Sequence, residues 1–373
     1  MRNEGVVGEL TFLRDLSPER FDTAPVLKRL ATTSRCLAEL KGVAGTLPNQ
    51  DILVRTLGLQ EAKDSSEIEN ILTTYDELFK DDSQEGPGPS PAVKEVHRYQ
   101  QAMQVGFASV RAKELLTLNQ ILEIQAVLEE NRAGFRKVPG TVLRAGDGRV
   151  VYTPPQHPDR IVDLMGELER FLNDPDVFPA DPLVKMALAH HQFESIHPFY
   201  DGNGRTGRIV NVLYLIQQGL LDTPVLYLSR RILQTKSEYY RLLQVVRDQD
   251  AWEAWVLYMF ECVEHTARDA IATVHALREA FYAAKHRIRD GYKFYSQDLL
   301  NNLFSHPYTK IEFVQKDLSV SRITATKYLD LLARDGVLEK RKVGRNNYYV
   351  NTALAGISTR GDGHAIRAEG ATK

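Results

Sequence analysis

The sequence is short of several features that would define its class at once. Only two cysteines occur in 373 residues, Cys36 and Cys262, and their separation suits neither a disulfide framework nor a metal site. No apolar run is long enough to span a bilayer, and the first residues lack the apolar core of a signal peptide. A formal net charge of -2 gives no chain-wide attraction for nucleic acid or anionic lipid. We therefore expect a cytoplasmic protein with buried thiols and no membrane partner.

What is present is an ordinary globular composition with helical patterning. Apolar residues recur three or four positions apart over most segments, for example over residues 115–128, which predicts a mainly α-helical fold. The length allows several domains, which we expect as an N-terminal helical region over 1–110, a core over 111–265, a connecting helix over 266–294 and a C-terminal domain over 295–352. The Gly- and Pro-containing residues 81–91 predict a flexible loop, and the polar residues 353–373 predict a disordered tail.

One β-hairpin interrupts the helical pattern. Two β-prone runs, residues 141–143 and 149–152, are joined by Ala-Gly-Asp-Gly, and Pro154-Pro155 stops the second run. The segment 141–155 therefore predicts a two-stranded flap, with an ordinary surface hairpin as the alternative.

Residues 197–208 read HPFYDGNGRTGR, a run too rich in polar and small residues for a purely structural loop. Because Gly202 and Gly204 lack side chains, successive backbone N–H groups can turn toward one point and cradle an anion. The apolar pattern of residues 206–217 predicts a helix that begins just after this cradle and directs its positive end to the same point. The run therefore predicts a polyphosphate site.

The charged residues of the run complete this chemistry. Arg205 and Arg208 lie three apart, so both guanidinium groups can reach one side of a first helical turn and bind phosphate oxygens. Asp201 supplies the single carboxylate that Mg²⁺ needs beside substrate phosphates. His197, largely neutral near pH 7, can take a proton from an attacking hydroxyl.

This run also allows three other interpretations. The glycines also spell the G-x-G-x-x-G of dinucleotide-binding proteins, but that site needs a preceding strand, whereas residues 186–196 predict a helix. A transition-metal site could use His190, His191, Glu194 and His197, although histidines near a core usually serve packing. The third interpretation is a glycine-rich loop whose arginines only pair with nearby acids.

The run matches the motif H-P-F-x-[D/E]-G-N-G-R-x-x-R at every specified position, and the chain resembles the Fic family. The similarity also includes the flap end Tyr152–Pro155, the helix expected over 161–173, and Tyr239–Leu243 before two tryptophans. It covers roughly residues 30–265.

The resemblance implies a helical core that moves AMP from ATP to Ser, Thr or Tyr hydroxyls of target proteins, including the protein itself. His197 would be the base and Asp201 the Mg²⁺ ligand, and the target backbone would dock on the flap as an added strand. The residues that would bind ATP are Gly202, Asn203, Gly204, Arg205, Thr206, Gly207 and Arg208. Tyr239 and Tyr240 either flank the adenine or pack in the core.

An inhibitory motif of the family, [S/T]-x-x-x-E-[G/N], is matched upstream at Ser65, Glu69 and Asn70. We expect a helix over about 64–79 that docks on the core and pairs Glu69 with Arg208, in the place of the γ-phosphate. Glu69 could also align water for removal of AMP. The alternative is a capping box formed by Ser66 and Glu69, which needs no function.

Residues 295–352 resemble a winged helix-turn-helix domain. Ser321 would cap a helix that turns three apolar residues inward and three polar ones outward, namely Ile323, Leu329 and Leu332 against Arg322, Thr324 and Lys327. The wing would have Gly344 at its tip and carry Lys340, Arg341, Lys342 and Arg345. These charges suit either DNA phosphates or a protein partner.

The function expected first is therefore an autoinhibited protein adenylyltransferase that uses ATP and Mg²⁺, acts on proteins including itself, and carries a winged-helix appendage. A DNA-binding regulator with a nucleotide-sensing core is the alternative from another class. A third hypothesis keeps the fold but transfers another group, as a kinase would. A homodimer is one assembly left open.

Overall fold

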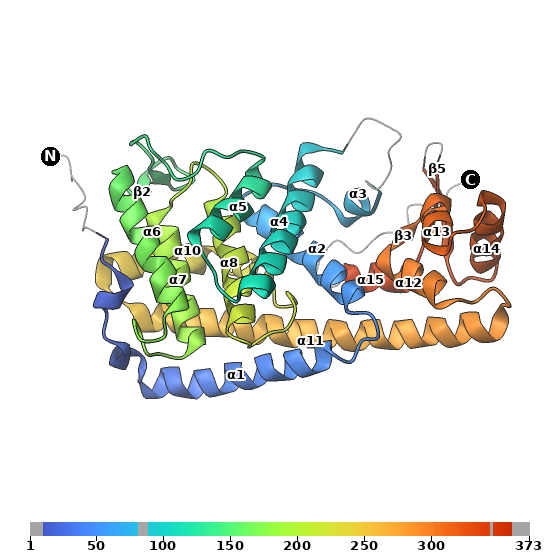
Figure 1. Cartoon of the computed structure of the whole chain (residues 1–373), viewed down its shortest axis with the longest axis horizontal. Coiled ribbons are helices and arrows are strands. Elements are labelled where there is room, and N and C mark those ends of the chain that lie inside the picture. Colours follow the sequence, from blue (N-terminus) through green and yellow to red (C-terminus); the bar gives the residue numbers. More distant parts are fainter. Residues whose placement is uncertain (1–9, 81–88, 344–345, 360–373) are drawn as a thin grey trace. The chain divides into compact units, whose positions relative to one another are not determined.

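The computed structural model describes residues 10–80, 89–343 and 346–359, and these are mainly helical, as the sequence predicts (Figure 1). They form two compact units. The described parts of Met1–Lys41, Glu61–Leu72 and Lys94–Arg268 make up the first unit. The second unit consists of the described parts of Gly42–Gln60, Thr73–Val93 and Asp269–Lys373.

The first unit is built almost entirely from helices. Its elements, some of which continue into the second unit, are the 3-10 helices η1 (Leu13–Asp15) and η2 (Pro18–Phe21), the helices α1 (Ala24–Ala44), α2 (Gln50–Ile68), α4 (Pro91–Lys113), α5 (Leu118–Glu129), α6 (Pro158–Asn173), α7 (Pro182–Ile196), α8 (Asn203–Gln217), α9 (Ser229–Gln234), α10 (Lys236–Gln249) and α11 (Trp252–Gly291), and the strands β1 (Leu143–Arg144) and β2 (Val150–Tyr152). In the described part of the chain, no helix combines the length and apolarity needed to cross a membrane.

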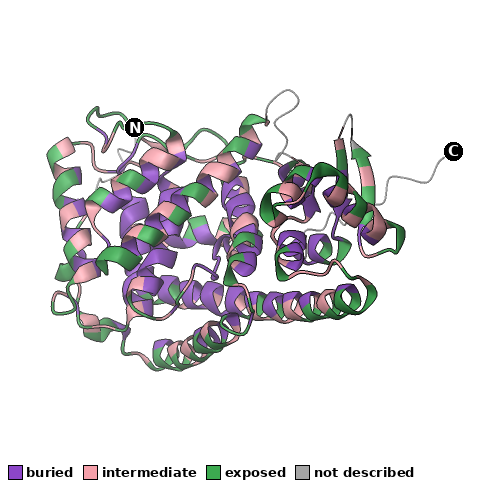
Figure 2. Cartoon of the chain, turned by 45° about the vertical axis from the view of Figure 1, so that its right-hand side comes forward, coloured by how far each residue is buried: buried purple, intermediate pink, exposed green. Residues whose placement is uncertain are grey.

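The helices α7 and α8 lie at the centre of the first unit. Every residue of α7 from Leu183 to Ile196 is buried, and α8 is buried from Arg205 to Ile216 (Figure 2). Asp181 caps α7 by accepting a hydrogen bond of 2.8 Å from the Leu183 N–H. Because such closely packed helices cannot shift without repacking their surroundings, the loop that joins them is held at both ends.

The predicted hairpin is present. Strand β1 pairs antiparallel with β2, with Leu143 opposite Tyr152 and Arg144 opposite Val150. Residues 141–142, which the sequence assigns to the first strand, stay outside it. Their neighbour Gly140 instead donates its N–H to the Gln156 side chain at 2.6 Å, and Gln156 donates in turn to the Thr141 carbonyl at 3.0 Å.

The helix predicted over 64–79 is wrong in its extent. Helix α2 ends at Ile68, and Asn70 adopts a left-handed conformation with φ 64°, which stops the helix. A separate helix, α3 (Tyr75–Lys80), then begins behind Thr74, which caps it by exchanging hydrogen bonds with Glu77. Glu69 therefore lies just past the end of α2.

The capping-box alternative for Ser66 is also wrong. Ser66 lies inside α2 and donates its hydroxyl to the Ala62 carbonyl at 2.7 Å. A residue in the helix interior cannot act as the N-cap of that helix.

Two predicted boundaries need correction as well. The limit at residue 265 falls inside α11, which runs without a break from Trp252 to Gly291. The expected tail begins as a helix, α15 (Thr352–Ser358), because Asn351 caps it and Leu354 and Ile357 are buried. Residues 360–373 of the tail, and 81–88 of the predicted loop, lie outside the described residues.

The second unit contains a small antiparallel sheet among short helices. In chain order its C-terminal elements are α12 (Gln297–Ser305), β3 (Tyr308–Thr309), α13 (Ile311–Leu318), α14 (Arg322–Arg334), β4 (Glu339–Val343), β5 (Asn346–Val350) and α15. The strand order is β3-β5-β4. The predicted wing tip, Gly344, and Arg345 lie outside the described residues.

Helix α14 turns a different face inward than the sequence suggests. Leu329 and Leu332 are buried as expected, but Ile323 is 83% exposed, and Ala325 takes the buried position. The buried set 325, 329 and 332 has the spacing of one helical face, and residue 323 falls outside it. As predicted, Ser321 caps the helix by accepting from the Thr324 N–H at 3.2 Å, and Arg322 and Lys327 are exposed.

Candidate active site

His197 stands at the start of the loop that joins α7 to α8. His197 ends α7 in a left-handed conformation with φ 48°, and its N–H donates to the Phe193 carbonyl at 2.9 Å. Asn203 fixes the loop, because its side chain accepts from the Phe199 N–H at 2.8 Å and donates to the Phe199 carbonyl at 2.9 Å. The Asn203 side chain is thus bonded within the loop. Its predicted contact with ATP would therefore be made by its backbone N–H.

The environment of His197 favours the neutral imidazole. Burial, together with the positive charges of Arg136 and Arg247, lowers the pKa of His197 to about 4. Its Nδ1 atom is buried and has no hydrogen-bond partner among the described residues. The imidazole is therefore neutral near pH 7, with one ring nitrogen free to accept a proton, as a general base requires.

Gly202 and Gly204 lie where a side chain would meet charged groups of the site. Gly202 has φ 76°, and a Cβ atom there would collide with the Glu129 carboxylate. A Cβ atom on Gly204 would collide with the carboxylate of Glu69 and would lie 2.9 Å from Nη1 of Arg208. A carboxylate of the chain itself thus lies against the N-terminal turn of α8, where an anion is expected to bind.

Arg208 is the partner of both predicted inhibitory side chains. Its side chain is only 1% exposed. It donates from Nε to the Ser65 hydroxyl at 2.8 Å, and from Nη2 to the Ser65 carbonyl at 2.9 Å and to Glu69 Oε1 at 3.1 Å. Although burial opposes its charge, nearby groups led by the Glu69 carboxylate raise the pKa of Arg208 above its usual value. The structure therefore brings Ser65 and Glu69 to Arg208, while Asn70, the third residue of the motif, is the turn that ends α2.

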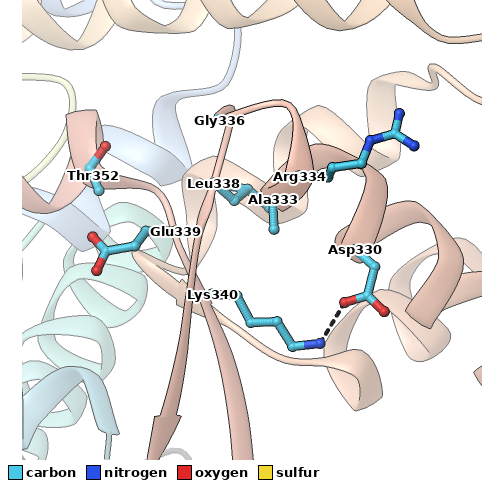
Figure 3. A pocket seen from close by; sticks show the side chains of 8 residues that line it. All are labelled: Asp330, Ala333, Arg334, Gly336, Leu338, Glu339, Lys340 and Thr352. Carbon is cyan, nitrogen blue, oxygen red and sulfur yellow. Dashed lines mark hydrogen bonds and ion pairs between the residues drawn. The ribbon is translucent and has the colours of Figure 1, made fainter. Parts of the chain in front are cut away.

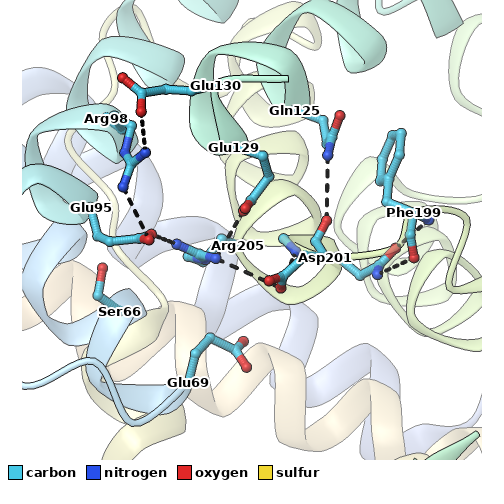
Figure 4. Close-up of polar contacts among 12 residues, drawn as sticks. Ser66, Glu69, Glu95, Arg98, Gln125, Glu129, Glu130, Phe199, Asp201 and Arg205 are labelled. Atoms are coloured by element: carbon cyan, nitrogen blue, oxygen red, sulfur yellow. Dashed lines mark hydrogen bonds and ion pairs between the residues drawn. The ribbon is translucent and has the colours of Figure 1, made fainter. Parts of the chain in front are cut away.

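Arg205 and Arg208 pair with different acids. Arg205 pairs with Glu95 of α4 and, at 2.8 Å, with Glu129 of α5 (Figure 4). Arg205 thus binds carboxylates of α4 and α5, whereas Arg208 binds the carboxylate of Glu69, which follows the end of α2. Arg205 would have to leave these acids, or share them, in order to contact phosphate, so its predicted contact stays a prediction.

Asp201 suits a divalent cation. Its side chain is 81% exposed and lies 3.9 Å from the Arg205 guanidinium (Figure 4). One carboxylate oxygen accepts from the Gly202 N–H at 2.7 Å. A single accessible carboxylate at the start of α8 fits Mg²⁺, which takes its remaining ligands from phosphate and water.

Two other predicted ATP contacts belong to the packing of α8. Thr206 is fully buried. A Cβ atom on Gly207 would lie 3.1 Å from the Phe193 ring and 3.3 Å from Glu194, so Gly207 allows α7 and α8 to approach closely. The Thr206 hydroxyl has no hydrogen-bond partner among the described residues, and the predicted contacts of both residues with ATP stay predictions.

The two tyrosines have different environments. Tyr239 is 1% exposed, and its hydroxyl lies 2.9 Å from Nε2 of His190. Tyr240 is 46% exposed. Tyr239 therefore fits the packing alternative, and Tyr240 is the better candidate for a contact with adenine.

Two of the rival interpretations find no support at this site, whereas both arginines do pair with nearby acids, as the third interpretation expects. A helix, α7, precedes the glycines where a dinucleotide fold needs a strand. His190 and His191 are used in packing, bonded to Tyr239 and to the Leu243 carbonyl, and burial lowers the pKa of both to about 3. Within the described residues, no group of three or more His, Cys, Asp or Glu side chains could hold a metal.

A pocket of about 580 Å³ lies elsewhere, in the second unit (Figure 3). Residues of α14, β4 and α15 line it, among them Asp330 and Thr352, together with Leu338 just before β4. Lys340, which we expected on the wing, also lines it and pairs with Asp330 at 2.7 Å. None of the residues predicted for ATP or Mg²⁺ is among those that line it.

Sequence reasoning missed several buried polar residues around the site. Glu61, one helical turn before Ser65, accepts hydrogen bonds from Tyr99 at 2.9 Å and from the Ser229 hydroxyl at 2.5 Å. The available signal was a carboxylate on the same helical face as Ser65. Arg136 and Arg247 also approach the His197 segment, and no motif around either residue marks it in the sequence.

Comparison with known proteins agrees with this geometry. Three sequence models match: "Fic/DOC family N-terminal" over residues 27–108, "Fic/DOC family" over 115–215, and "Protein adenylyltransferase SoFic-like, C-terminal domain" over 282–354. A protein adenylyltransferase Fic of Drosophila erecta is 31% identical over 172 residues, which are 44% of this chain and 31% of the relative. A protein of the same name from Aedes aegypti is 32% identical over 164 residues, 42% of this chain and 30% of the relative. The matches thus span under a third of these relatives.

A solved structure agrees in fold. The crystal structure of a Fic family protein from Desulfovibrio desulfuricans G20 superposes with a TM-score of 0.58 at 20% identity, covering 88% of this chain and 96% of the other. The protein thus has the mainly helical Fic fold, with a flap hairpin and a loop that carries the complete histidine motif. It belongs to the Fic/DOC family.

Proposed function

We propose that the protein is an adenylyltransferase that transfers AMP from ATP to hydroxyl groups of target proteins and is held inactive by Glu69. The observation that carries this proposal is the contact of one buried arginine, Arg208, with Glu69 beside the N-terminal turn of α8. That turn is the expected site of a triphosphate. The same loop carries His197 as a neutral base.

The reaction needs positioning and charge neutralisation from the protein. His197 takes the proton of a Ser, Thr or Tyr hydroxyl as the oxygen attacks the α-phosphorus of ATP. The bond between the α-phosphorus and the oxygen bridging to the β-phosphorus breaks, and pyrophosphate leaves. The target then carries AMP through a new phosphodiester bond.

The phosphates would be held by the first turn of α8. In this proposal, the backbone N–H groups of residues 203–204, at the N-terminal end of α8, donate to the phosphate oxygens. Arg208 would bind the terminal phosphate once Glu69 has moved away. Mg²⁺, when bound at Asp201, would neutralise phosphate charge.

Target proteins would dock on the flap. In this proposal, an extended target segment adds to the strand pair β1–β2 and brings its hydroxyl to His197. Recognition through the backbone leaves the target side chains largely unread, so segments of the protein itself also qualify as targets. With Glu69 beside the site, water aligned by this carboxylate could also remove AMP.

The proposed inhibition has a shielded ion pair as its basis. Exposed pairs contribute only about 0 to 1 kcal/mol, and the Arg208 side chain is almost completely buried whereas Glu69 is 35% exposed. Loss of Glu69 would leave Arg208 with Ser65 as its hydrogen-bond partner. The freed guanidinium would then be available to phosphate.

The position of the labelled phosphorus in the product tests the reaction. Purified protein carrying Glu69→Gly is incubated with ATP labelled at the α- or the γ-phosphate. We expect α-label on protein, lost in His197→Ala and retained in a matched control, His157→Ala, whose histidine is exposed. Label from the γ-phosphate alone would identify a kinase, and no label from either position would contradict group transfer altogether.

We also propose that residues 295–352 form a winged helix-turn-helix. Support comes from the order α12, β3, α13, α14, β4, β5 and from the capping of α14 by Ser321. On the wing, Lys340 pairs with Asp330 and Arg341 with Glu339, so both charges are partly neutralised. Lys342 and the exposed Lys327 of α14 remain for a partner.

Binding to duplex DNA distinguishes the regulator hypothesis from a role in protein docking. A DNA-binding domain should bind with an affinity that falls steeply with salt and is weakened by Lys327→Ala together with Lys342→Ala. Lack of any salt-dependent binding would favour a protein partner.

A further inference from the structure

Two arginines outside the motif, the buried Arg136 and the partly buried Arg247, connect the flap to the end of α7. Arg136 is 1% exposed. It donates from Nε to the His197 carbonyl at 2.7 Å, and from Nη2 to the carbonyls of Pro155 at 2.9 Å and Ile196 at 3.3 Å. One guanidinium therefore joins the C-terminal end of the flap to the carbonyl oxygens of the two peptide groups that flank His197.

Arg247 makes a second connection between the same two segments. It extends from α10, donates from Nε to the Ser195 hydroxyl at 3.0 Å, and has its guanidinium carbon 3.9 Å from the centre of the Tyr152 ring. Tyr152 of β2 donates its own hydroxyl to the Ser195 carbonyl at 2.9 Å. The flap strand thus rests on Arg247 and on the last turn of α7, two residues before His197.

We propose that Arg136 and Arg247 act as one pair of positioning residues, which fastens the flap to the His197 backbone so that a target on the flap and the base meet in register. The proposal rests on the adenylyltransferase function proposed above. Arginine suits both places, since its planar fork reaches several carbonyls at once and its face stacks on an aromatic ring.

The same pair also affects the protonation of His197. The charged groups that act on its imidazole are Arg136 and Arg247, which disfavour a second positive charge, and Glu69, which favours it. Burial and the two arginines together lower the pKa of His197 to about 4. Removing the charge of Arg247 should therefore raise the pKa of His197 and move the acidic limb of the pH–rate profile to higher pH.

The test compares variants of Arg247 in the full chain with Glu69→Gly as the parent. The pH dependence of kcat/KM is measured for transfer of α-label to protein. We expect Arg247→Gln to shift the acidic limb upward by about half a pH unit or more and Arg247→Lys to leave it close to the parent. Arg241→Gln is the matched control, because Arg241 lies on the same helix, is exposed and pairs with Glu238 of that helix.

A second readout reports on the flap without using activity. Arg144 and Arg149 lie in the hairpin, so trypsin can cut there when the flap loosens. Arg136→Lys and Arg247→Gln should each speed this cleavage about tenfold or more, if each contact contributes more than 1.4 kcal/mol to flap closure, and Arg241→Gln should not. If Arg247→Gln does not fold, Tyr152→Leu removes the stacked ring instead and should give the same faster cleavage.

The outcomes separate this inference from the proposed function. Suppose that the parent is active, that Arg247→Gln leaves the acidic limb of the pH–rate profile unchanged, and that neither Arg247→Gln nor Arg136→Lys speeds cleavage of the flap. The proposal of a positioning pair would then be overturned. A parent that transfers no α-label would overturn the proposed function, while faster flap cleavage in the variants would still support the connection between the flap and α7.

Discussion

Replacing Glu69 by glycine should activate the protein, and the structure sets the scale of the effect. The Glu69 carboxylate pairs with Nη2 of Arg208 at 3.1 Å and lies against Gly204. The substitution would therefore remove a negative charge from the place where phosphates must bind and free a buried guanidinium for them. No other carboxylate pairs with Arg208 among the described residues.

The magnitude follows from the exposure of the two partners. An exposed pair contributes about 0 to 1 kcal/mol, while breaking a fully buried one costs about 3 to 5 kcal/mol. Here one side chain is 1% exposed and the other 35%. Solvent screening at Glu69 therefore reduces the free energy of the Glu69–Arg208 pair to roughly 2 to 3 kcal/mol. Its loss corresponds to about a 30- to 150-fold rise in AMP transfer.

Initial rates of self-labelling with α-labelled ATP, at ATP concentrations below saturation, measure this effect. Glu67→Gly is the matched control: it also introduces a glycine near the end of α2, but its carboxylate pairs with Lys63. We expect Glu69→Gln to activate as well, because it removes the charge at nearly constant size. If Glu69→Gly labels no faster than the wild type or Glu67→Gly, the inhibitory role assigned to this ion pair is wrong.

Three further predictions concern the same site. Because the pKa of His197 is lowered to about 4, the imidazole is the active base above that value, so kcat of Glu69→Gly should stay level through pH 6.5 and fall only near pH 4; a limb near pH 6.5 would contradict the buried environment. Ser65→Ala removes the 2.8 Å hydrogen bond to Arg208 and should raise basal labelling about 5- to 10-fold, less than Glu69→Gly does, whereas Ser66→Ala, whose hydroxyl donates to the Ala62 carbonyl within α2, should not. Gly204→Ala in the Glu69→Gly background should weaken ATP binding at least about tenfold by calorimetry, because the methyl group would enter the phosphate space; unchanged affinity would place the phosphates elsewhere.

Local features of the site could be predicted from the sequence because they depend on neighbouring residues. The glycine turn and the start of the helix that follows it lie within residues 197–208. At Gly202, φ is 76°, a conformation that glycine adopts readily. The hairpin and the cap of α14 by Ser321 are equally local. Helical pattern and capping residues depend on contacts within a few positions, so a single sequence carries them.

Which partner each charged side chain chooses depended on tertiary structure. Arg205 and Arg208 look equivalent in the motif, yet one faces acids from α4 and α5 and the other faces Ser65 and Glu69. The break after Ile68 brings Glu69 to Arg208 from the end of a helix rather than from its middle. In α14 the apolar pattern alone did not decide whether Ile323 or Ala325 faces inward.

The sequence by itself therefore determined the helical class, the family motif and the chemistry of its side chains, since these follow from residue type and short-range spacing. Only the tertiary structure decided that Arg136 and Arg247 meet the flap and the His197 segment, and that Arg205 pairs with acids of α4 and α5. The physical reason is that pairing and burial of charge depend on packing between distant elements, and spacing along the chain does not encode that packing.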